Sequence, residues 1–61
     1  MFSNEQIEIL SDYTDNLDEV ESISYHDYTV KYDSKQISKL LDDNHVIWFN
    51  DDPGKLYLVK K

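Results

Sequence analysis

The sequence predicts a small α+β domain with two helices and an antiparallel sheet, in the order α-β-β-α-β-β. In the first third of the chain, apolar residues recur three and four positions apart, the period of a helix buried on one face. From Val20 the period changes to two, as in strands. Two later apolar runs flank turn-forming residues and predict a hairpin. With 61 residues, the chain is expected to be one acidic domain spanning 1–61.

The first helix is predicted to begin at Asn4, because Ser3 and Gln6 match the capping-box pattern. Its apolar face comprises Ile7, Leu10, Tyr13 and Leu17. Asp, Thr and Asn between positions 12 and 16 are poor residues for a helix interior. We therefore expect the helix to fray or end near Asn16.

Two short strands are predicted next, because large residues alternate and then change parity. Ile23 and Tyr25 occupy odd positions. Tyr28, Val30 and Tyr32 then occupy even positions. The change falls at His26–Asp27, which predicts a tight turn or a bulge between two strands.

A second helix is predicted after Asp33 or Ser34, since both residue types cap helix N-termini well. It is expected to end near Asn44. Three apolar side chains are expected to point inward from it, those of Ile37, Leu40 and Leu41.

The C-terminal hairpin is predicted from the apolar runs Val46–Phe49 and Leu56–Val59. Between them, Pro53 and Gly54 suit the two central positions of a type II turn. Only one face of the sheet is expected to be covered, which leaves exposed the face with Ile47, Phe49, Tyr57 and Val59. An apolar face of that size often marks an interface, so self-association through the hairpin is one hypothesis.

Charge is segregated along the chain. The first thirty residues contain eight carboxylates and no Lys or Arg, and the remainder contains five carboxylates and six lysines. The net charge of −7 is therefore −8 in the first half and +1 in the second. Such a negative region repels nucleic acid and membranes and attracts proteins with positive surfaces.

Five of these carboxylates are predicted to form a stripe on the first helix, opposite its apolar face. They are Glu5, Glu8, Asp12, Asp15 and Glu19, separated by 3, 4, 3 and 4 positions. At the helical rise they would span about 21 Å. The plain interpretation is a solvated face, but such faces normally mix charges of both signs. Residues 1–30 contain no lysine at all, which favours the interpretation that the negative potential itself serves a function.

Catalysis and metal binding are not expected. The chain has no Cys, no glycine-rich phosphate loop and no nucleophile elbow, and a domain of this size has little room for a cleft. Asp42, Asp43 and His45 form the only candidate metal cluster, and we interpret them as polar residues at a helix end. No cofactor is expected.

The sequence also carries hints of origin. No apolar run approaches the roughly 20 residues that a membrane span needs, and the N-terminus does not resemble a signal peptide. We therefore expect a protein of the bacterial cytoplasm. The lack of Arg and Ala is typical of an AT-rich gene, such as that of a phage of a low-GC bacterium.

Glu21, Ser22 and Ile23 begin the first predicted strand, directly after Asp18 and Glu19. In the neutral interpretation, they are a strand with one buried Ile. Residues 3–25, a helix followed by this Glu-Ser-Ile strand, resemble the phage-encoded uracil-DNA glycosylase inhibitors, which are acidic DNA mimics. The apolar hairpin over residues 46–59 also resembles the end of such inhibitors, although this chain is shorter than their familiar members.

The resemblance implies a mode of binding. In that family the Glu-Ser-Ile strand enters the DNA-binding groove of the enzyme, where the Glu takes the place of a backbone phosphate. A pocket between helix and sheet holds the leucine that the enzyme normally inserts into DNA. Only Glu21, Ser22 and Ile23 match the motif. The apolar pattern of this chain supplies the expected pocket residues: Ile37, Leu40, Leu41, Val46 and Trp48.

The sequence thus predicts a protein inhibitor that mimics DNA and occludes the groove of a nucleic-acid enzyme, with uracil-DNA glycosylase favoured as the target. It is expected to bind as a monomer, through Ser22 and Ile23 together with the acidic residues Glu5, Glu8, Asp12, Asp15, Asp18, Glu19 and Glu21. One alternative is a DNA mimic directed at a restriction, CRISPR or transcription protein. The other is a homo-oligomeric interaction module whose acidic face confers solubility.

Overall fold

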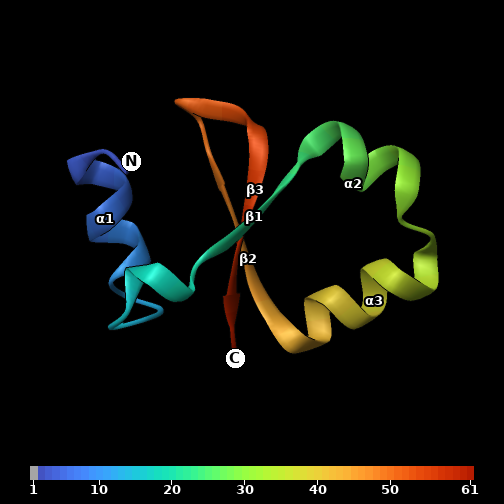
Figure 1. Ribbon diagram of the computed structural model, residues 1–61, viewed down its shortest axis with the longest axis horizontal. Coiled ribbons are helices and arrows are strands. Elements are labelled where there is room, and N and C mark those ends of the chain that lie inside the picture. Colours follow the sequence, from blue (N-terminus) through green and yellow to red (C-terminus); the bar gives the residue numbers. More distant parts are fainter. Residues whose placement is uncertain (1) are drawn as a thin grey trace.

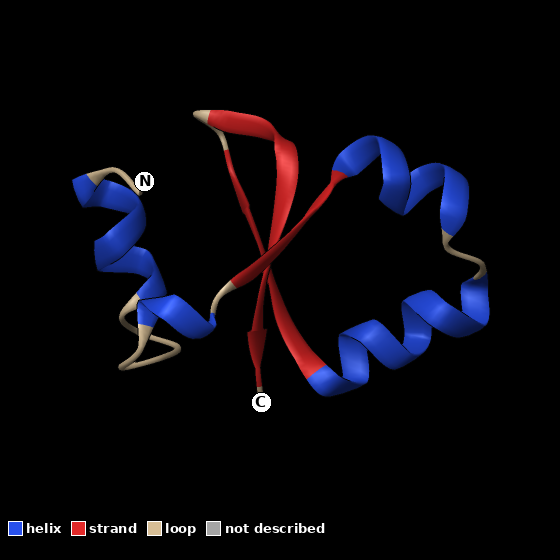
Figure 2. Cartoon of the chain, in the orientation of Figure 1, coloured by secondary structure: helices blue, strands red, loops and turns tan. Residues whose placement is uncertain are grey.

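The computed structural model describes residues 2–61, which form a three-stranded antiparallel sheet with helices on both sides (Figure 1 and Figure 2). The strands are β1 (Glu21–Ser24), β2 (Asn44–Phe49) and β3 (Asp52–Lys60), and they lie in the order β1-β3-β2. The helices are α1 (Asn4–Leu10), α2 (Tyr25–Lys31) and α3 (Ser34–Asp43), with a short 3-10 helix, η1 (Leu17–Glu19), before β1. The α+β class is confirmed, but the order is α-β-α-α-β-β, with one strand fewer and one helix more than expected.

The core lies between α1 and one face of the sheet. Leu10 is completely buried, and it packs with four buried residues of the hairpin, namely Ile47, Phe49, Tyr57 and Val59. These four residues were expected on an exposed face, and that prediction is wrong. The reason is that α1 and the segment after it cover this side, where Phe2, Leu17 and Val20 complete the packing.

α1 begins as predicted and ends earlier. The Ser3 hydroxyl accepts from the Gln6 N–H at 3.2 Å, and the Gln6 side chain accepts from the Ser3 N–H at 3.0 Å. The helix ends at Leu10, where the Ser11 hydroxyl donates back to the Ile7 carbonyl at 2.7 Å. Ser, Thr and Asp favour such local bonds over a continuing helix. Hence Asp12, Asp15 and Glu19 lie outside α1, and the predicted five-carboxylate stripe on one helix does not form.

The predicted second strand, around Tyr28 and Tyr32, is instead helix α2. Ser24 caps it by accepting from the Asp27 N–H at 3.0 Å, and Asp27 pairs with Lys31 at 3.5 Å, one turn later. Tyr25, Tyr28 and Tyr32 are three and four positions apart, which is a helical spacing, whereas Tyr28, Val30 and Tyr32 also alternate as in a strand. The ring centroids of the three tyrosines lie 6.3 Å apart in successive pairs along the helix. The capping serine and the ion pair therefore decide between two periodicities that the apolar residues alone leave open.

The hairpin turns at Asn50 and Asp51, earlier than predicted. Phe49 pairs with Asp52, after a bulge between Trp48 and Phe49. Pro53 and Gly54 therefore lie within β3. A type II turn needs a positive φ at its third residue. No residue between 2 and 61 has one, Gly54 included.

The bounds of α3 agree with their prediction, since Asp33 caps the helix and forms a second capping box with Gln36. The expectation that Leu41 points inward is wrong, because Leu41 is 46% exposed, whereas Ile37 and Leu40 are half-buried. Both α2 and α3 lie within the described residues, and neither helix contains a buried residue. The accessible surface is 4685 Å², against about 4200 Å² expected for a folded chain of this mass. The helix pair α2–α3 is thus a loosely packed cover on the second face of the sheet (Figure 1).

Tyr57 joins the core to the hairpin turn. Its ring packs against Phe2 and Phe49, with centroids 5.4 and 5.3 Å apart, and its hydroxyl donates to the Asp52 carboxylate at 2.6 Å. This hydrogen bond, together with burial and the negative charges of Asp52 and Asp51, raises the pKa of Tyr57 to about 12.

Replacing Leu10 by Ala is expected to lower the free energy of unfolding by about 2–5 kcal/mol, because the deletion leaves a cavity in a small core. The matched control is Leu41→Ala, since Leu41 is 46% exposed. Its cost should stay below about 1 kcal/mol. Urea unfolding followed by circular dichroism measures both. Equal losses for the two variants would show that Leu10 is not the centre of the core.

Alkaline pH is expected to destabilise the fold partly through Tyr57. The unfolded chain ionises this phenol near pH 10, whereas the folded protein holds its proton up to about pH 12. The stabilisation is therefore complete below pH 10 and is lost as the pH rises from 10 to 12. In Tyr57→Phe, the fall in unfolding free energy over this window should be smaller by about 2 kcal/mol.

The control for this pH series is Tyr25→Phe, because Tyr25 is 50% exposed. Urea titrations at several pH values between 8 and 12 give the slopes. Parallel curves for wild type and Tyr57→Phe would contradict the assigned role of the Asp52 hydrogen bond.

Candidate protein-binding surface

The Glu-Ser-Ile motif forms β1, which lies at an edge of the sheet with β3 as its neighbour. Upstream, Asn16 caps η1 by accepting from the Asp18 N–H at 3.1 Å, and Val20 closes it. The chain therefore leaves η1 in an extended conformation and enters the sheet at Glu21. Edge strands present unpaired backbone groups at which another protein can dock.

The register places two rows of side chains on the sheet face opposite α1, which α2–α3 partly covers and which we call the binding face. One row runs across the three strands as Glu21, Leu58 and Val46, and the other as Ile23, Leu56 and Trp48. Leu56 and Leu58, on the central strand, are buried. The β1 edge of this face ends in an exposed carboxylate, and the β2 edge ends in Trp48, which is 52% exposed.

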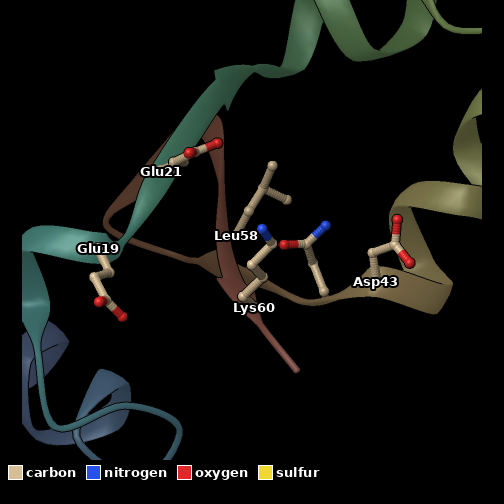
Figure 3. A pocket seen from close by; sticks show the side chains of 6 residues that line it. Glu19, Glu21, Asp43, Leu58 and Lys60 are labelled. Atoms are coloured by element: carbon tan, nitrogen blue, oxygen red, sulfur yellow. The ribbon is translucent and has the colours of Figure 1, made fainter.

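A hollow of about 180 Å³ opens on the binding face beside β1. It is lined by Glu19, Glu21, Asp43, Asn44, Leu58 and Lys60 (Figure 3). Glu21 reaches it from β1, Asp43 from the end of α3, and Leu58 and Lys60 from β3. The hollow thus has carboxylates on two sides and an aliphatic side chain between them.

The other predicted acidic residues are spread over the N-terminal part of the molecule. Glu5 and Glu8 lie on α1, Asp12 and Asp15 in the connection to η1, and Asp18 within η1. All of them are exposed. Among residues 2–61 the one ion pair within 4 Å joins Lys31 and Asp27, so these five carboxylates have no cationic partner in the described chain.

The predicted pocket residues come from two elements, the strand β2 and the helix α3. Val46 and Trp48 belong to β2, whereas Ile37, Leu40 and Leu41 belong to α3. Leu40 lines a hollow of about 290 Å³ together with Tyr32, Gln36, Lys39, Asp43 and Asn44. Trp48 lines a different hollow near α1, and its indole N–H donates to the Pro53 carbonyl at 3.2 Å. Leu40 and Trp48 therefore line two different hollows, and the predicted single pocket of all five residues is not seen in the described chain.

Four residues of the acidic hollow were not predicted as site residues: Asp43, Asn44, Leu58 and Lys60. From the sequence, Asp43 was interpreted as a solvated polar residue at the end of a helix. Only the sheet register, in which Glu21 faces Leu58 and Asn44 faces Lys60, brings them together. No local sequence signal reports that register.

His45, which belongs to the candidate cluster of Asp42, Asp43 and His45, lies on β2 directly after α3. The His45 ring lies against Tyr13, with centroids 5.0 Å apart. Within the described part of the chain, no group of three or more His, Asp or Glu side chains is placed to hold a metal ion. In the same residues, no helix has the length and apolar character that crossing a membrane requires.

Comparisons with protein-family models, with curated proteins and with solved structures found no match to this chain. The functional interpretation therefore depends on the geometry of the site and on the motif at residues 21–23.

Proposed function

We propose that this protein is an inhibitor that mimics DNA and occludes the DNA-binding groove of a nucleic-acid enzyme. The favoured target is a uracil-DNA glycosylase. The protein acts in the bacterial cytoplasm as a non-enzymatic, phage-encoded binding partner, and it associates with its target as a monomer.

The position of Glu21 is the main support for this proposal. Its carboxylate is exposed on an edge strand and stands at the rim of a hollow that Glu19, Asp43, Asn44, Leu58 and Lys60 also line. A strand of this kind enters a groove more readily than a central strand does, because its outer edge is unencumbered. Glu21 then offers a negative charge where the enzyme expects a phosphate.

The remaining carboxylates support the proposal electrostatically. Seven exposed acidic side chains lie between residues 5 and 21, on α1, η1, the segment between them and β1, namely Glu5, Glu8, Asp12, Asp15, Asp18, Glu19 and Glu21. Fields of this kind accelerate the encounter with a basic groove, and salt screens them. Ile23, half-buried at the same edge, and Trp48, exposed on β2, supply apolar contacts that slow dissociation.

The same geometry suits other DNA-binding enzymes, so a restriction, CRISPR or transcription protein is the alternative target. Self-association has less support. The hairpin face on which that hypothesis depended is buried beneath α1, with Tyr57 and Val59 only 8% and 4% exposed. Of the hairpin's large apolar side chains, Trp48 is the exposed one.

The proposal predicts stoichiometric inhibition of uracil excision by a bacterial uracil-DNA glycosylase. Glu21→Lys should weaken inhibition by at least about thirtyfold, because it places a cation in the centre of a positive groove. The matched control is Glu8→Lys, which makes the same charge change on α1. A peripheral charge of that kind should alter inhibition by less than about fivefold. Excision from a labelled uracil-containing oligonucleotide is the measurement.

Undiminished excision at a large molar excess of the protein would exclude this target. Equal effects of the two variants would show that general acidity, and not the β1 strand, carries the inhibition. Circular dichroism of both variants establishes that each remains folded.

A further inference from the structure

The sheet has a second edge, formed by β2 on the side away from β1. In Figure 1 the strands overlap at the centre, with α1 on the left and α2–α3 on the right, so no helix of residues 2–61 covers this edge. The Lys61 N–H donates to the Asp43 carbonyl at 3.0 Å, which identifies these residues as a hydrogen-bonded pair of the β2–β3 ladder. Such pairs alternate in an antiparallel ladder. Val46 and Trp48 therefore direct their backbone N–H groups outward, away from β3.

β2 lacks the features that keep edge strands from pairing with another chain. Its six residues, Asn44–Phe49, include no Lys, Asp, Glu or Pro. Edge strands are commonly protected by such residues or by being very short. The bulge follows Trp48, so the pairing of residues 44–48 with β3 is regular. β1, at the other edge, has four residues and an exposed carboxylate at Glu21. Of the two edges, β2 is thus the one suited to strand pairing.

Exposed apolar side chains gather beside this edge. Near the hairpin turn, Ile9 of α1 and Trp48 line one hollow of about 180 Å³, and they are 36% and 52% exposed. Near the other end of β2, Tyr13 is 46% exposed and packs its ring on His45, with centroids 5.0 Å apart. Contiguous apolar surface of this kind marks an interface.

We propose that the β2 edge pairs antiparallel with the same edge of a second copy of this chain, which joins the two sheets into one. The two-fold axis passes beside Val46. There each Val46 backbone bonds the other, and each Trp48 N–H donates to the Asn44 carbonyl of the other copy. The same patch serves both copies, as a two-fold dimer requires.

The apolar side chains of the edge complement one another under this symmetry. Antiparallel pairing brings the turn end of one β2 to the first residues of the other. Ile9 and Trp48 of one copy therefore meet Tyr13 and His45 of the second copy. Aromatic and aliphatic groups paired across neighbouring strands in this way stabilise a sheet.

The charges at the two ends of the edge also favour a second copy as the occupant. Glu5 and Asp51 line the hollow at the turn end. At the other end, Lys60 pairs with Asn44 across the ladder, and Lys61 follows it. Antiparallel pairing therefore places the two lysines of one copy near the two carboxylates of the other, and β2 itself contributes no charge between them.

This pairing goes beyond the proposed function and does not compete with it. The contact uses the β2 edge, and not the hairpin face that is buried beneath α1. β1 becomes the outer strand at each end of the joined sheet. Each protomer therefore still meets one target through its own Glu21.

Trp48→Lys tests the inference, because it places a charge on both paired strands and removes an exposed aromatic side chain. In sedimentation equilibrium, the wild-type mass should rise with concentration from 7.3 kDa toward twice that value. The variant should weaken dimerisation by at least about tenfold. The matched control is Tyr25→Lys, since Tyr25 is an aromatic residue of α2 that is 50% exposed. It should change the dimer dissociation constant by less than about twofold.

A charge exchange tests the orientation of the pair. Glu5→Lys and Lys61→Glu should each weaken dimerisation by about twofold to fivefold, because each places like charges together across the contact. The double variant should recover most of the loss, since it restores opposite charges. Additive losses in the double variant would contradict the antiparallel arrangement.

Amide hydrogen exchange identifies the edge directly and needs no target enzyme. Exchange at Val46 and Trp48 should slow as the protein concentration rises, whereas exchange at Ser22, on β1, should not change. A monomeric mass at millimolar concentration would overturn the inference. So would protection of Ser22 in place of Val46, or a dimer that Trp48→Lys leaves intact while circular dichroism shows the variant to be folded. Inhibition of a uracil-DNA glycosylase is a separate readout, so each proposal can fail without the other.

Discussion

The pairing of β3 with both of its neighbours is the constraint on which the rest of the molecule depends. β3 is the central strand, and its residues Leu56–Val59 are four consecutive buried positions. Two of them, Tyr57 and Val59, belong to the core and pack in one buried cluster with Leu10. The other two, Leu56 and Leu58, support the binding face. One register therefore fixes both the hydrophobic core and the arrangement of residues around Glu21, because a shift of one residue would exchange the two faces.

The segment that supplies much of the core also carries most of the negative charge. The core is built by α1 and the hairpin, yet the N-terminal segment that supplies α1 and β1 also carries exposed carboxylates without lysine partners. Their mutual repulsion lowers the stability of a domain whose core is already small. The helix pair α2–α3 contributes no buried residue among those described, and Leu56 and Leu58 are the buried residues of the sheet face that it covers. Such a sequence is expected where negative potential serves recognition more than stability.

Local chemistry determined which elements the sequence could predict. Both capping boxes, at Ser3 and at Asp33, are complete within four residues, and the helices begin where they indicate. Tyr28, Val30 and Tyr32 alternate as in a strand, but Tyr28 and Tyr32 are also one helical turn apart, so the alternation was mistaken for a strand. Pro53 and Gly54 were mistaken for a turn, because the pairing of Phe49 with Asp52 closes the hairpin first. At the binding surface, the strand that begins at Glu21 was predictable, whereas its edge position and its proximity to Asp43 and Lys60 follow only from the long-range register.

Competition with DNA tests the central claim most directly, since mimicry requires that the protein and DNA occupy the same groove. Fluorescence anisotropy of a labelled uracil-containing duplex, bound to a catalytically inactive uracil-DNA glycosylase, is recorded while this protein is added. Mimicry predicts complete release of the duplex at one equivalent of protein, with an apparent affinity that falls as duplex concentration rises. A ternary complex, in which the duplex stays bound while the protein also binds, would contradict the account.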